Sequence, residues 1–238
     1  MDIVLFIIII VVASILQTST GFGFSIMATP FLLLLFEPAE AIQINLILSL
    51  LISISLIYKI KKDINFGIMK RLIAGSFVGL PIGIWVFLWL DLQNLKLLVS
   101  LVILVLTTLL ILKYRIRRSK NRDLVVGWFS GSLTASIGMP GPPLLLYFSG
   151  TDTKKDRLRG TTLAYFLFIY LVSLLVQIIF AGTSPRVWEA SIIAVPLVLV
   201  GLVLGQKLFV KLNQDLFRTV TYILLIFTGL YLLFDSLF

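Results

Sequence analysis

The 238-residue chain contains 59% hydrophobic and only 13% charged residues, with a mean hydropathy of +1.10. So few charged residues leave too little polar surface to cover a water-soluble globule. The composition therefore predicts an all-α integral membrane protein in a lipid bilayer. The chain has no cysteine and no histidine, which excludes disulfide frameworks, thiolate chemistry, the usual zinc sites and imidazole acid–base chemistry. We therefore expect no metal and no cofactor.

Apolar stretches long enough to cross or enter a membrane follow one another from residue 3 to the end of the chain. The start, Met1-Asp2-Ile3, lacks the basic region of a signal peptide, so the first stretch is expected to be a retained helix. No region is typical of a soluble domain. The ten predicted segments are 3–18, 21–36, 40–58, 66–90, 97–112, 124–137, 140–149, 158–181, 188–210 and 216–237.

The formal charge of +9 does not indicate a nucleic-acid binder, because the basic residues lie in the loops between apolar segments. If every segment turns back, 18 of the 20 Lys and Arg residues lie on one side of the membrane and only Lys96 and Arg186 on the other. Positive loops stay in the cytoplasm. The sequence thus predicts a multi-pass protein of the cell inner membrane with both termini outside.

The two halves of the sequence resemble each other on either side of a basic loop at 113–123. The run Gly79-Leu80-Pro81-Ile82-Gly83 matches Gly201-Leu202-Val203-Leu204-Gly205 at an offset of 122 residues. Residues 1–112 and 124–238 then hold five segments each, and an odd number turns the second half upside down. The sequence predicts two inverted membrane repeats joined by a cytoplasmic loop, with chance similarity among apolar sequences as the alternative.

Glycine and proline, instead of a charged loop, separate the first two segments of each half. The breaks lie at 17–25 and 134–143. Glycine permits positive φ and close backbone approach, and successive prolines stop a helix. Non-helical backbone at membrane depth is tolerated only where protein buries it or water reaches it. We expect short, broken segments, either half-helices or re-entrant hairpins, that meet near the midplane and form a transport site.

The chemistry of these breaks favours a small anionic substrate. A helix that restarts after a break offers unpaired N–H groups and about half a positive charge at its N-terminus. No Asp or Glu lies in the middle of a segment, which argues against a cation carrier, and no fixed buried cation is expected at the site. The predicted substrate-binding residues are Gln17, Thr18, Ser19, Thr20, Gly21, Gly23, Ser25, Asn45, Thr134, Ser136, Gly138, Gly141, Thr161 and Thr162, with Tyr165 as a further candidate.

A structural explanation stands beside each of these assignments. The glycines at the breaks can serve only close helix packing, and Ser or Thr in an apolar helix commonly bonds the carbonyl four residues earlier. The G-x-x-x-G pairs Gly79/Gly83 and Gly201/Gly205 are expected to pack helices together or to form the face of a homodimer.

Three motifs stand out in the chain: Thr20-Gly21-Phe22-Gly23 with Pro30-Phe31-Leu32, Glu37-Pro38-Ala39-Glu40-Ala41, and Gly138-Met139-Pro140-Gly141-Pro142-Pro143-Leu144-Leu145-Leu146-Tyr147. They resemble the paired signatures of the sulfite exporter TauE/SafE family. Members of this family usually have a denser glycine run where this chain has Phe22 and Phe24. The resemblance implies a bacterial or archaeal carrier linked to sulfite, sulfonates or other small organic anions.

The expected function is therefore a secondary carrier for a small anion such as sulfite or a sulfonate, working as an exporter because the potential, negative inside, drives anions outward. A passive anion channel and an uptake carrier for a small carboxylate remain alternatives. A membrane enzyme would need paired carboxylates, a histidine cluster or a nucleophile with its base at membrane depth, and the sequence has none of them.

Overall fold

The computed structural model describes residues 3–89, 91–112, 119–151, 153–211 and 214–237. Within these ranges the chain forms ten α-helices, a single 3-10 turn and no strand, which confirms the predicted all-helical class. The elements are α1 (Ile3–Thr20), α2 (Phe24–Leu32), α3 (Pro38–Ile60), η1 (Lys61–Asp63), α4 (Phe66–Trp89), α5 (Leu92–Ile111), α6 (Lys120–Ile137), α7 (Gly141–Gly150), α8 (Lys155–Ala181), α9 (Pro185–Lys211) and α10 (Gln214–Leu237).

Five of the described helices are long and apolar enough to cross a membrane: α1, α3 together with η1, α4, α8 and α9. Their outer faces carry large exposed apolar side chains such as Phe77, Ile193 and Val203. Serine, threonine, asparagine and glutamine side chains are buried inside the same bundle. An apolar exterior around a partly polar interior is the arrangement expected of a protein whose solvent is lipid.

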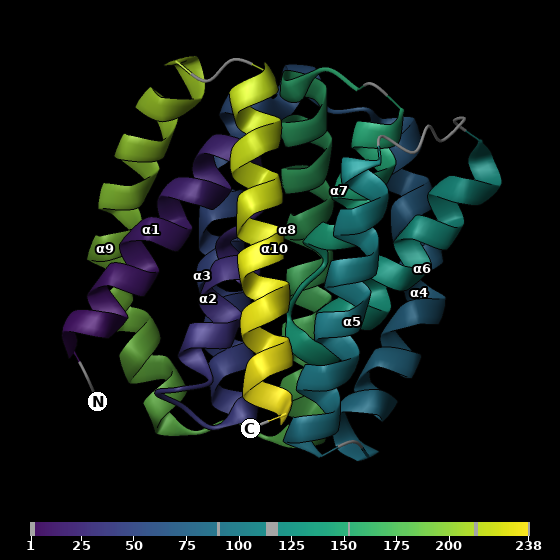
Figure 1. Cartoon of the computed structure of the whole chain (residues 1–238). Helices are drawn as coiled ribbons and strands as arrows, with labels where there is room; N and C mark the ends of the chain where they lie inside the picture. Colours follow the sequence, from purple (N-terminus) through teal and green to yellow (C-terminus); the bar gives the residue numbers. More distant parts are fainter. Residues whose placement is uncertain (1–2, 90, 113–118, 152, 212–213, 238) are drawn as a thin grey trace.

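The helices pack in pairs around a central pair formed by α3 and α8. Helix α1 packs on α9, α6 packs on α4, and α10 packs on α5, as Figure 1 shows. The central pair also contacts two of the outer pairs: α3 contacts α9, and α8 contacts α4. The chain enters and leaves the described structure at the same end of the bundle (Figure 1).

Small residues allow the closest of these helix contacts. A Cβ on Gly79 or Gly83 would lie 2.1 or 2.2 Å from a backbone oxygen of α6. A Cβ on Gly201 or Gly205 would lie 2.3 or 2.6 Å from side-chain carbons of α1. These glycines therefore pack helices of the same chain together, which is the first of the two roles predicted for them, and they do not form a dimer face.

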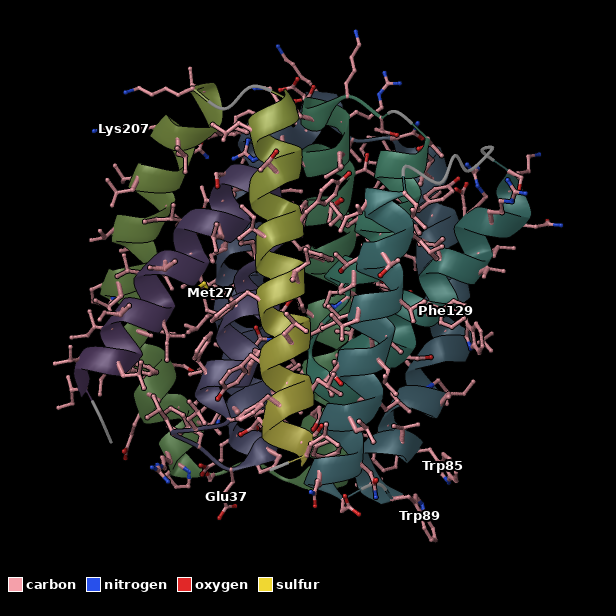
Figure 2. All side chains as sticks on the ribbon, viewed as in Figure 1. Met27, Glu37, Trp85, Trp89, Phe129 and Lys207 are labelled. Carbon is pink, nitrogen blue, oxygen red and sulfur yellow. The ribbon has the colours of Figure 1, made fainter. Side chains whose placement is uncertain are left out.

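The two ends of the bundle differ in charge. The end formed by η1, the starts of α6 and α8 and the end of α9 carries most of the described Lys and Arg residues, and we call it the basic end. Glu37, Trp85 and Trp89 lie at the opposite end, far from Lys207 (Figure 2). Trp85 and Trp89 are both exposed, and exposed tryptophan at the end of a bundle is typical of a membrane interface.

The first segment of each half is longer than predicted. Helices α1 and α6 have 18 residues each, about 27 Å at 1.5 Å per residue, so only α2 and α7, with 9 and 10 residues, are short. The expectation of a short segment was wrong for the first segment of each half, because α1 continues to Thr20 and α6 begins at Lys120. The Ser19 and Thr20 hydroxyls donate to carbonyls of their own helix and so fit inside it.

Candidate functional site: two helix breaks in a polar interior

The first break lies between α1 and α2 and depends on two glycines with positive φ. Gly21 has φ +85° and Gly23, which caps the start of α2, has φ +115°. The Thr20 hydroxyl connects the two sides of this break, because it lies within hydrogen-bonding distance of the Leu16 carbonyl in α1 and of the Phe22 carbonyl in the break. A Cβ on Gly21 would lie 2.7 Å from the Cα of Arg159, so α8 packs directly against the break. Only glycine combines this φ with so close an approach.

The second break lies between α6 and α7 and has one glycine with positive φ. Gly138 has φ +72° and ends α6, with its amide donating to the Thr134 carbonyl. Its own carbonyl accepts a hydrogen bond from Asn45 Nδ2 of α3 at 2.9 Å. The Ser130 hydroxyl donates to the Pro140 carbonyl and holds the far side of the break to α6. Residues of α3 and α6 thus satisfy the backbone that leaves the helix.

The two breaks lie against each other. A Cβ on Gly141, the first residue of α7, would lie 3.6 Å from Cβ of Phe22 and 3.4 Å from Cδ1 of Ile26. Both distances are ordinary van der Waals contacts. The N-terminal ends of α2 and α7, which are far apart in sequence, therefore meet in the interior of the bundle.

A polar network on α3 and α8 surrounds the first break. Gln17 of α1 donates to the Ser49 carbonyl at 3.0 Å and lies 3.4 Å from the Ser53 hydroxyl. The hydroxyl of Tyr170 lies between the side chains of Ser49 and Ser25, the latter in the first turn of α2. Gln17 and Ser25, both predicted site residues, are thus brought to one place by two residues that the sequence analysis did not single out.

A second network lies beside the other break. The Tyr165 hydroxyl is 2.7 Å from that of Ser76 on α4, and it also contacts Ser130 of α6. Gln177 donates to the Ala135 carbonyl at 2.7 Å, near the end of α6. Helix α8 therefore contributes one tyrosine to each network and connects them.

Other predicted site residues make local or distant bonds. The hydroxyls of Ser19, Thr134 and Ser136 donate to carbonyls of their own helices, the structural alternative stated for such residues. Thr161 accepts a hydrogen bond from the Asn65 amide at 3.0 Å and so holds the α3–α4 connection at the basic end. It does not lie at a break.

A buried cation lies beside the first break, contrary to the expectation of none. Arg159 is 5% exposed, and its Nε donates to the Thr18 carbonyl at 2.8 Å. Its guanidinium lies over the Phe209 ring of α9, 4.1 Å from the centroid. The sequence pattern assigns Arg159 to a basic loop, because Lys154, Lys155 and Arg157 closely precede it. Contacts with Thr18 of α1 and Phe209 of α9, which sequence spacing does not reveal, enclose its guanidinium.

A buried carboxylate lies at the basic end of the bundle. Asp123, in the first turn of α6, pairs with Nε of Arg71 at 2.6 Å and accepts a hydrogen bond from the Tyr147 hydroxyl. At the opposite end Glu40 lies 3.7 Å from Arg186 and accepts a hydrogen bond from Ser184. Each ion pair joins a helix that ends before residue 113 to a helix that begins after residue 118.

Comparison with known proteins identifies the family of this chain. The family model for the sulfite exporter TauE/SafE matches residues 5–232, nearly the whole chain. The chain belongs to this family. Neither the curated proteins nor the solved structures contain a significant match to it.

Family membership makes the chain a multi-pass membrane transporter, which agrees with its apolar helices. The family consists of transporters and not of enzymes. The sequence resemblance is thus confirmed, including its extent over both halves of the chain.

Some of the missed residues carried a sequence signal. Ser49 and Ser53 follow the predicted site residue Asn45 at four-residue intervals in an otherwise apolar segment, so the three form a polar stripe on one face of α3. Tyr170 stands in the middle of a span instead of at an interface, where tyrosine is common. Such polar residues inside a membrane segment indicate function or a buried partner.

Proposed function

We propose that the chain is a secondary carrier that exports a small sulfur-containing or organic anion, such as sulfite or a sulfonate, across the cell inner membrane. The observation that carries this proposal is the contact between Gly141 and residues 22 and 26, which brings the starts of α2 and α7 together in the buried interior. The substrate would bind there, among the predicted residues Gln17, Gly23, Ser25, Asn45 and Gly141.

The electrostatics of the two short helices support an anion. Each helix N-terminus contributes about half a positive charge, so the pair suits a monoanion or a loosely held dianion. The amides of Phe24 and Ser25 precede Met27, whose amide donates to the Gly23 carbonyl, and they can point at a ligand. Among the described residues no group of three or more Asp and Glu side chains that could hold a metal cation is found.

Burial of the site favours a carrier over a passive channel. Gln17, Ser25 and Asn45 are all buried. The ion pairs Arg71–Asp123 and Arg186–Glu40 join the two halves at opposite ends of the bundle. A substrate would therefore reach the site only after helices of one half move relative to the other, which is the requirement of alternating access.

Sulfite flux into proteoliposomes tests this function. We expect the initial rate to saturate with sulfite concentration and to rise when the opposite side is preloaded with unlabelled sulfite. A rate that stays linear in concentration and shows no trans-stimulation would indicate the channel instead. Saturable flux of a small carboxylate, with none of sulfite or sulfonates, would favour the uptake carrier.

We also propose that residues 1–112 and 124–238 are inverted repeats, with the basic end in the cytoplasm and both termini outside. In support, α1 packs on α9 as α6 packs on α4, and α3 contacts α9 as α8 contacts α4. The paired glycines match this exchange, since Gly79 faces α6 and Gly201 faces α1. Each of these contacts therefore has a counterpart in which the corresponding helices of the two halves are interchanged.

Cysteine labelling tests this topology, because the chain has no cysteine of its own. Exposed Glu37 and Asp91 replaced by cysteine should react with an impermeant thiol reagent added outside intact cells. Exposed Lys61 and Lys120 replaced in the same way should react only after the membrane is opened. Labelling of all four variants from outside would contradict the inverted arrangement.

A further inference from the structure

Arg159 has more hydrogen-bonding capacity than the protein around it uses. Its Nε donates to the Thr18 carbonyl, and the face of its guanidinium lies against Phe209. Its Nη2 is buried and has no hydrogen-bond partner among the residues that the structure describes. A guanidinium presents five N–H donors in a fixed fork that matches the oxygens of an oxyanion.

The charge of Arg159 is only weakly balanced by the protein. The carboxylates that interact with it are those of Asp156 and Asp63, and both side chains are exposed, where water screens them. Lys155 adds a second positive charge, since its Nζ lies 4.9 Å from the centroid of the same Phe209 ring. A buried cation without a close counter-ion is costly, and an anionic ligand would remove that cost.

Two threonines beside Arg159 also have unused hydroxyls. Thr18 is the residue whose carbonyl Arg159 binds, and Thr162 lies one turn further along the same side of α8. Thr18 is 0% and Thr162 1% exposed, and neither Oγ1 has a hydrogen-bond partner within the described ranges. Buried hydroxyls are normally bonded, if only to the carbonyl four residues earlier, as in Thr134. Three buried donors that no described residue uses thus lie on neighbouring residues: two on one side of α8 and one on the α1 residue that Arg159 binds.

We propose that Arg159, Thr18 and Thr162 bind one oxyanion group of the substrate at the basic end of the bundle, as an entry site distinct from the contact of the two breaks. The site rests on the proposed function and gives it a specific ligand chemistry: a sulfite, sulfonate or carboxylate group accepting from one guanidinium N–H and two hydroxyls. The same face of α8 carries Tyr170 about 16 Å further on, at the first turn of α2, so the helix would guide the anion toward the breaks.

Thr18→Val and Thr162→Val separate binding from folding, because each removes a hydroxyl that no described residue bonds. A structural role predicts unchanged or slightly higher thermal stability and unchanged affinity. Our proposal predicts the same stability but about tenfold weaker binding of methanesulfonate, measured by titration of the purified protein. The control is Thr107→Val, a buried threonine on α5 whose hydroxyl donates to its own helix and should leave the affinity unchanged.

Arg159→Lys keeps the charge and removes the fork, and Arg159→Gln removes both. We expect the KM for sulfite efflux to rise at least tenfold in each, more in Arg159→Gln, while Arg157→Gln, an exposed neighbour, keeps the wild-type KM. If the wild type binds and transports sulfite but neither threonine variant weakens binding, the entry site is wrong and the proposed function stands. If the wild type binds and transports no small anion, the proposed function itself fails.

An anionic phospholipid offers the same oxyanion chemistry, so the titration is repeated with and without phosphatidylglycerol in the detergent micelles. Methanesulfonate binding that is unaffected by the lipid supports a substrate site, as the burial of all three side chains leads us to expect. Displacement of methanesulfonate by the lipid in the wild type but not in Arg159→Gln would assign the cluster to a lipid headgroup and overturn the proposal.

Discussion

The two helix breaks perform the same task with different chemistry. At the first, two glycines with positive φ turn the chain, and the backbone of α8 fills the space beside Gly21. At the second, a single positive-φ glycine, Gly138, ends α6, and Gly141 begins α7 with room for a further carbon beside it. One break is therefore sterically closed, whereas the other retains space toward its partner.

The breaks also differ in what they offer an anion. Each residue in the first turn of α2, Phe24 to Ile26, carries a backbone N–H, as none of them is a proline. Helix α7 has Pro142 and Pro143 in its first turn, and proline has no N–H. From this difference we expect α2 to donate the backbone hydrogen bonds to the substrate, while α7 contributes mainly its helix dipole and the surface beside Gly141.

Replacement of Gly21 should have the largest effect on the fold. Gly21→Ala forces an L residue to φ +85° and places its Cβ 2.7 Å from the Cα of Arg159, where backbone cannot yield easily. Positive φ costs roughly 1–2 kcal/mol, and overpacking adds about 1–3 kcal/mol. We expect a large fall in the Tm of the detergent-purified protein, or no folded protein at all.

Gly182→Ala is the matched control for this variant. Gly182 has a similar φ, +74°, at the end of α8, but nothing lies within 4 Å of the added Cβ. It should therefore show only the conformational cost of its backbone, with φ +74° and ψ −174°, of roughly 1–3 kcal/mol. Equal losses of stability in the two variants would mean that α8 does not close the first break.

Gly138→Ala should have an intermediate effect. Its φ of +72° carries the same conformational cost, but the nearest obstacle is the end of the Asn45 side chain, at 2.5 Å, which can rotate away. Rotation would break the bond from Asn45 to the Gly138 carbonyl, adding about 1 kcal/mol. A double-mutant cycle with Asn45→Ala measures this coupling in thermal melts, and fully additive losses would show that the two residues do not interact.

Replacement of Gly141 should have the smallest effect on the fold. It is helical, and a Cβ there makes only ordinary contacts, so Gly141→Ala should change stability by less than about 1 kcal/mol. The bulkier Gly141→Leu should fill the contact between the breaks and abolish sulfite flux in proteoliposomes while the protein still inserts. Normal flux through Gly141→Leu would place the substrate elsewhere.

The sequence was sufficient to predict the features that depend on local composition. Apolar length located the ten helices of the described residues, and glycine with proline located both breaks. The family resemblance rested on the same break motifs. Helix ends were less predictable: the hydroxyls of Ser19 and Thr20 bond within α1 and prolong it where polar residues had suggested an earlier stop.

Features that depend on packing between distant helices were not predictable from one sequence. Arg159 stands in a basic loop pattern, and only the approach of α1 and α9 buries it. Gly21, Gly23 and Gly141 are equivalent in the sequence pattern, yet a Cβ meets backbone at Gly21 and makes only ordinary van der Waals contacts at Gly141. Thr161 had seemed to belong with Thr162, but it bonds the Asn65 amide instead.

The most direct test of anion export at the two breaks is the current or flux of sulfite through proteoliposomes under an imposed membrane potential. A potential of 100 mV acts on one moving charge with about 2.3 kcal/mol. We predict that sulfite efflux from the negative compartment accelerates with the potential, and that a neutral solute of similar size does not move. Flux of a neutral or cationic solute, with no response to sulfite or any sulfonate, would contradict the anion site.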